Sequence, residues 1–176
     1  ETGFSILALS VDSRLGIPIL FLLIPARALT LALWSLALTI VKENTETLRF
    51  SSARGILRNM PFAATGLVLA TLSTGAFPRL ASFPPRLALW ESVSRASSTS
   101  AIWMGVGIAG LLVSAIRSLA VAAMADEYAS WKPRENLPQM IMLGLGAIGL
   151  FILGLFPQTA QVFLAKLPLM FEHLGR

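Results

Sequence analysis

The chain has 176 residues and a net charge of +5, and 55% of its residues are hydrophobic while only 13% are charged. Soluble domains carry about a quarter charged residues, so this composition and the mean hydropathy of +0.73 indicate an integral membrane protein. The arginines are spread singly between apolar runs and form no basic stripe, which argues against nucleic acid and for membrane lipid as a partner. With no cysteine and a single histidine, His173, a thiolate nucleophile, a disulfide framework and a Cys/His metal site are excluded. We therefore expect no metal and no cofactor.

Apolar runs fill most of the chain, at residues 15–41, 62–77, 80–93, 101–125 and 138–156. A hydrocarbon core of about 30 Å is crossed by about 20 apolar residues, so these runs predict an all-α, polytopic transmembrane helical bundle of about five membrane helices. We expect residues 1–176 to form a single transmembrane domain that is part of a longer subunit. Residues 158–176 are expected to be an interfacial C-terminal segment.

The first run contains a proline, Pro25, followed closely by the charged residue Arg27. Proline removes a backbone donor and tends to kink a helix, which would turn the charge toward protein or water. The alternative is an arginine that snorkels to the membrane interface, for which Arg27 lies rather deep. We favour the inward-facing position.

The centre of the chain holds a cluster of helix-breaking residues. The second apolar run meets Gly75 and Pro78, then Pro84 and Pro85, and Arg86 follows directly. Because prolines cannot donate backbone hydrogen bonds, the pattern predicts a helix broken near Pro84 and Pro85, with an irregular first turn and unsatisfied backbone groups. In a bilayer such groups need protein or water as partners, so we expect Arg86 to line a cavity inside the protein.

Two further charges lie within the predicted spans. Glu91 lies five residues after Arg86, and Arg117 is the one charge in residues 101–125. Ionisable residues inside membrane segments usually face the interior of the bundle and mark ion pathways. Together with Arg27, these residues are our candidate buried charges for ion translocation.

Small residues recur at helical spacing in the second run, as Ala63, Gly66, Ala70 and Ser73. Such a stripe predicts close packing against a neighbouring helix. Glycines are also frequent in residues 105–110, where no strand precedes them, so helix packing is favoured over a nucleotide-binding loop.

Several short segments resemble motifs of one membrane-protein family. Residues 55–61, GILRNMP, are similar to a G-L-x-R-x-M-P motif at the start of a helix, and residues 72–78, LSTGAFP, to L-S-L-A-G-L-P. Residues 81–86, ASFPPR, are similar to x-G-F-x-x-K, and residues 154–158, GLFPQ, to G-L-F-P-Q. In this order, the motifs resemble the C-terminal half of the antiporter-like membrane subunits of respiratory complex I (NADH-quinone oxidoreductase) and of related multisubunit cation/proton antiporters.

The resemblance covers about residues 14–158, and Arg117 falls where this family carries an arginine late in a helix. It implies a non-redox membrane-arm subunit in a bacterial plasma membrane, with other membrane subunits as partners and no catalytic residues of its own. In this family, protons move past buried charges in broken helices, where protonation of one group shifts the pKa of the next.

The chain departs from the family at the charged positions themselves. The broken-helix lysine aligns with Arg86, and the family's H-x-x-x-K pattern aligns with Arg27 and Leu31. A buried lysine can release its proton, whereas a guanidinium keeps it, because its pKa lies far above the physiological range. Arg86 is therefore expected to act as a fixed positive charge that pairs with Glu91 or with a carboxylate on another helix.

Three hypotheses follow: a proton-translocating complex I-like subunit, a scaffold paralogue that has lost the relay lysines, and a subunit of a cation/proton antiporter. The orientation in the membrane stays open. Five crossings would divide the cations into two sets, Lys42, Arg49, Arg54, Arg58, Arg95, Lys166 and Arg176 on one side and Arg14, Arg79, Lys132 and Arg134 on the other.

Overall fold

The fold was analysed in a computed structural model, which describes residues 2–11, 13–45, 56–124 and 135–158. The described residues form α-helices and their connections, without strands, as expected. The helices are α1 (Thr2–Ser10), α2 (Ser13–Thr45), α3 (Ile56–Asn59), α4 (Pro61–Thr74), α5 (Phe83–Ala96), α6 (Ser98–Ala123) and α7 (Leu137–Leu155). The segment predicted to lie at the interface, 158–176, falls outside the described residues except for its first residue.

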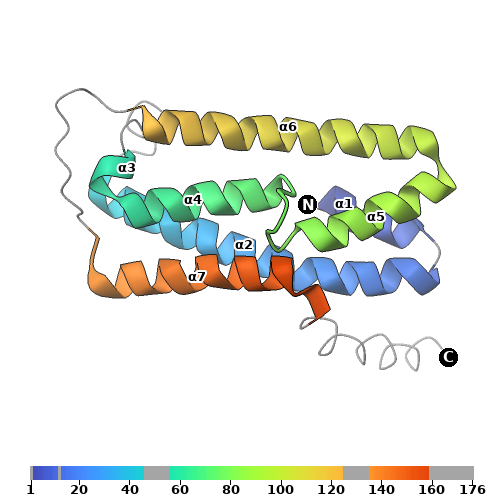
Figure 1. The fold of residues 1–176 in the computed structure, drawn as a ribbon, viewed down its shortest axis with the longest axis horizontal. Coiled ribbons are helices and arrows are strands. Elements are labelled where there is room, and N and C mark those ends of the chain that lie inside the picture. The colour runs from blue at the N-terminus through green and yellow to red at the C-terminus, as the bar shows by residue number, and fades with distance from the viewer. Residues whose placement is uncertain (1, 12, 46–55, 125–134, 159–176) are drawn as a thin grey trace.

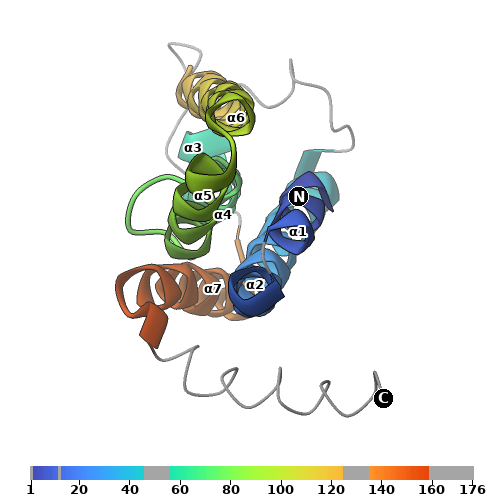
Figure 2. The same ribbon diagram turned by 90° about the vertical axis from the view of Figure 1, so that its right-hand side faces the viewer.

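The helices α4 and α5 follow one another through the centre of the bundle. In Figure 1, α4 occupies one half of the molecule's length and α5 the other, and the antiparallel helix α6 runs past both. Seen end-on, α4 and α5 lie between α6 on one side and α2 with α7 on the other (Figure 2). The interrupted helix is thus the middle layer of the fold.

Among the described residues, three helices are long and apolar enough to cross a membrane: α2 over Gly16–Asn44, α6 and α7. The prediction of about five such helices was too high. The second and third apolar runs became α4 and α5, each of 14 residues, which is short of the roughly 20 that a crossing needs. Together, placed end to end, α4 and α5 match the length of the single helix α6 (Figure 1).

The helix ends are defined by local sequence. Ser97 caps α6 by accepting a hydrogen bond from the Ser100 amide at 3.3 Å, and Asn136 with Gln139 forms a capping box at the start of α7. Pro25 lies inside α2, which continues as one helix to Thr45.

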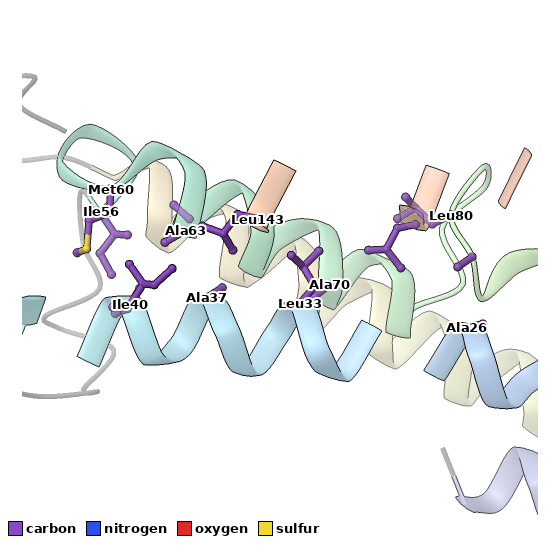
Figure 3. Close-up of a cluster of buried hydrophobic side chains, with 14 residues drawn as sticks. Ala26, Leu33, Ala37, Ile40, Ile56, Met60, Ala63, Ala70, Leu80 and Leu143 are labelled. Carbon is purple, nitrogen blue, oxygen red and sulfur yellow. The ribbon is translucent and has the colours of Figure 1, made fainter. Parts of the chain in front are cut away.

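Two separate hydrophobic clusters pack along α2. The first core cluster joins one half of α2 to α3, α4 and α7, through residues such as Leu33, Met60 and Leu143 (Figure 3). The second core cluster joins the other half of α2 to α1, α5 and the start of α6, through residues such as Leu23 and Leu89. Each half of the interrupted helix therefore has its own core.

The small-residue stripe of α4 is buried as predicted. Ala63, Gly66, Ala70 and Ser73 all lie inside the protein, and a Cβ on Gly66 would come within 3.1 Å of the Leu143 side chain. The absence of side-chain bulk lets α4 approach α2 and α7 closely.

The glycine-rich stretch of α6 packs only at its start. A Cβ on Gly105 would lie 2.6 Å from the Trp90 ring, whereas Gly107 and Gly110 face open space. Helix packing, favoured from the sequence, therefore explains one of these three glycines within the chain.

Candidate functional site

The interruption between α4 and α5 covers residues 75–82, called the break below. Pro78 lies within the break, but Pro84 and Pro85 lie in the first turn of a regular α5. Amides of a first helical turn have no partner inside the helix, so prolines there cost no hydrogen bond. The expected irregular first turn at these two prolines was wrong, because the chain is irregular before them.

The break satisfies the last carbonyl groups of α4 in a compact turn. The Gly75 amide donates to the carbonyls of Thr71 and Leu72, both at 3.1 Å, and the Ala76 amide donates to Ser73 at 3.0 Å. Ala76 and Arg79 adopt left-handed backbone conformations, with φ of 56° and 72°. Such conformations are costly for residues with side chains, so the surrounding contacts must hold the break in this shape.

Arg86 supplies the donor for the final carbonyl group of α4. Its side chain is buried, with 1% exposed, and its Nη1 donates to the Thr74 carbonyl. The guanidinium also lies over the ring of Phe4 in α1, with its central carbon 4.3 Å from the ring centre. A cation–π contact is strongest in a site shielded from water, as here.

The helix dipoles explain why the guanidinium extends toward α4. Arg86 lies one turn into α5, near its positive end, where a cation is disfavoured. The carbonyl end of α4 carries partial negative charge and faces the same point. Because the helix is interrupted here, the positive side chain of one half-helix is stabilised by the negative end of the other.

A chain of buried hydroxyl groups lies beside the break. Thr30 of α2 and Ser73 of α4 have their oxygens 2.9 Å apart, and Ser73 and Ser82 have theirs 3.2 Å apart. All three residues are buried, with at most 3% exposed. Each hydroxyl can donate and accept, so the hydroxyl chain of Thr30, Ser73 and Ser82 can reverse its direction without moving its oxygens.

The other predicted charges lie elsewhere. Arg27 is half-buried on α2, one turn before Thr30, and Glu91 and Arg117 are exposed, so the prediction that these last two are buried within this chain was wrong. Glu91 pairs with Arg95 at 2.6 Å. The predicted pairing of Glu91 with Arg86 was wrong. Glu91 and Arg95, four residues apart, share a helix face, whereas Arg86 and Glu91, five residues apart, do not.

One carboxylate with a structural role, Glu135, was not predicted from the sequence. Glu135, before α7, is 9% exposed and accepts hydrogen bonds from the amides of Phe62 at 3.2 Å and Ala63 at 2.5 Å. These amides belong to the first turn of α4, where an anion satisfies free donors and the positive helix end. Glu135 therefore caps α4 from a distant part of the chain.

An apolar pocket opens next to the break, where α2, α5 and the end of α7 meet. Its wall contains three prolines, and it is lined by Leu22, Pro25, Ala26, Ala81, Pro85, Leu153 and Pro157. Within the described part of the chain, no three or more His, Cys, Asp or Glu residues are grouped to hold a metal ion.

No protein-family model matches this sequence, and a comparison with curated proteins found no match. The resemblance to antiporter-like subunits therefore stays a prediction that rests on the motifs.

Proposed function

We propose that this chain is a non-redox membrane-arm subunit, or part of one, of a complex I-like proton-translocating NADH-quinone oxidoreductase in a bacterial plasma membrane. The observation that carries the proposal is Arg86, a buried cation at the interruption of a helix in the middle layer of a membrane protein. Placing a charge there costs free energy, and such residues are kept where they act on ions.

Arg86 has the role of a fixed charge in this proposal. A guanidinium does not release its proton under physiological conditions, so Arg86 would act through its fixed charge on a titratable group that another subunit brings near it. At an effective dielectric constant of about 20, a unit charge about 8 Å away contributes about 2 kcal/mol, or about 1.5 pKa units.

The hydroxyl chain gives the same region a route for protons. Thr30, Ser73 and Ser82 connect α2 to the break through two oxygen contacts. Hydroxyl groups pass protons by exchanging donor and acceptor roles, without becoming charged for long. In this proposal, the half-channel runs past Arg27 and the hydroxyl chain, and Arg86 sets the proton affinity along it.

The test is proton transport by the assembled complex in vesicles, followed with a pH-sensitive dye. We expect Arg86→Ala to lower coupled transport, and Arg86→Lys, which keeps the charge and adds a releasable proton, to retain or increase it.

Arg95→Ala is the matched control, since Arg95 lies in the same helix but is exposed and paired with Glu91. It should leave transport unchanged. Equal transport by Arg86→Ala and the parent, at equal subunit content, would remove Arg86 from any transport role and favour the scaffold paralogue. Purification without flavin and iron–sulfur subunits would favour the stand-alone antiporter.

A further inference from the structure

The outward side of α6 carries a charge on an apolar surface. Val106 and Val113 are 57% and 65% exposed, and Arg117 is exposed on the same side. The buried residues of α6, such as Ala115, lie on the opposite side, because positions two apart in a helix of about 3.6 residues per turn point away from each other. We call Val106, Gly110, Val113 and Arg117 the Arg117 face.

Arg117 lies inside the span and not at its edge. We place one membrane interface at Trp103, which is 70% exposed, because tryptophans are enriched where membrane and water meet. A core of about 30 Å holds about 20 helical residues, which places the other interface near Ala123. Arg117 then lies roughly 9 Å inside the hydrocarbon, and its side chain leans toward the start of the helix, away from the nearer interface.

Within the described residues, Arg117 makes no ion pair. A guanidinium exposed to lipid at this depth is costly, whereas one facing a carboxylate across a helix contact is neutralised. We propose that the Arg117 face binds a transmembrane helix of another subunit, which carries an aspartate or glutamate at the depth of Arg117.

The surface next to Arg117 allows a helix to approach closely. Gly110 lies two turns before Arg117, and a Cβ on Gly110 or Gly107 would meet nothing within 4 Å. A partner helix could therefore pack against the backbone of α6, which shortens the path from its carboxylate to the guanidinium. The interface needs only that the chain spans a membrane, and it holds whether or not Arg86 acts in transport.

The test replaces Arg117 by lysine, whose amine can be cross-linked to a nearby carboxyl group. In native membranes containing Arg117→Lys, dicyclohexylcarbodiimide activates carboxyl groups within the hydrocarbon, and the introduced amine attacks the activated carbon. An amide bond forms, and the lost oxygen leaves as dicyclohexylurea. Mass spectrometry should locate the cross-link at an aspartate or glutamate in a membrane span of a different protein.

The controls separate this outcome from others. Ile116→Lys, at the same depth on another side of α6, should give no such link. Arg95→Lys with a water-soluble carbodiimide should link to Glu91 and show that the chemistry works. With that control positive, a link from Arg117→Lys to lipid only, to a second copy of this chain, or to nothing overturns the proposal.

A charge exchange tests the pair itself. Arg117→Gln should weaken retention of the cross-linked partner at least about tenfold, because one charge of the pair is left without its opposite. Arg117→Glu combined with lysine at the partner's carboxylate should restore it. If the exchange does not restore retention although both single variants insert normally into the membrane, a direct ion pair is contradicted. Neither the loss of retention nor its restoration depends on proton transport.

Discussion

Arg86 shows how groups that carry only partial charge contribute to holding a buried cation. A carbonyl at the end of α4 and the ring of Phe4 both face it. Their contributions depend on geometry, since a dipole acts strongly only at close range. The guanidinium of Arg86 therefore stays positively charged whatever its surroundings. The free energy of that buried charge depends on the shape of the break, which sets its distance from the carbonyl.

Glu135 has a structural role that can be tested by one substitution. Glu135→Gln should lower the free energy of unfolding by about 1 to 2 kcal/mol, because an amide oxygen caps the first turn of α4 less well than a carboxylate. The measurement is thermal or denaturant unfolding in detergent micelles. Glu91→Gln, which removes an exposed ion pair, should cost less than about 1 kcal/mol. Equal losses for the two variants would contradict the capping role.

At the scale of the elements, α7 and the break are in backbone contact. A Cβ on Gly154 would overlap the carbonyl group of Arg79 and come within 2.5 Å of the Leu80 carbonyl carbon. Only glycine permits this approach, and backbone atoms cannot turn aside as a side chain can. The end of α7 therefore holds the break in place.

Gly154→Ala should destabilise the protein by about 1 to 3 kcal/mol, because α7 must move away from the break. Gly144→Ala is the matched control in the same helix, since its Cβ would meet nothing within 4 Å. That change should be neutral or stabilise α7 by up to about 1 kcal/mol. Unfolding in detergent distinguishes the two, and a Gly154→Ala variant as stable as the parent would contradict the contact.

The sequence allowed the helical class, an interruption between the second and third apolar runs and the burial of Arg86 to be predicted, although the interruption lies before Pro84 and Pro85. These follow from hydropathy and from proline chemistry, which act locally. The partners of Arg86 could not be predicted, because Phe4 and Thr74 lie 82 and 12 residues away in the chain. Glu135 was missed for the same reason, as it caps a helix 72 residues earlier.

At the scale of the whole molecule, the arrangement changes how often the chain crosses the membrane. If α4 and α5 together form one crossing, α2, α6 and α7 add three, and the C-terminal ends of α2 and α6 lie at the same end of the bundle (Figure 1). By sequence, four crossings group Lys42, Arg49, Arg54, Arg58, Lys132 and Arg134 on the side where α2 and α6 end, against Arg14, Arg95, Lys166 and Arg176 on the other side. The positive-inside rule places the first end in the cytoplasm.

This topology can be mapped with single cysteines, because the chain has none of its own. Lys42→Cys and Asn136→Cys, both at exposed positions, should react with a membrane-impermeant maleimide from the cytoplasmic side. Ser94→Cys should react only from the other side. Labelling of the cysteines at 42 and 136 from opposite sides would mean that α4 and α5 cross separately.

The division of the core has a mechanical consequence. Because α4 belongs to the first core cluster and α5 to the second, the two half-helices are anchored to different stretches of α2. Arg86 of α5 donates to the Thr74 carbonyl of α4, so this one contact links the half-helices of the two clusters. The position of α5 relative to α4 is therefore coupled to the electrostatic surroundings of its buried cation.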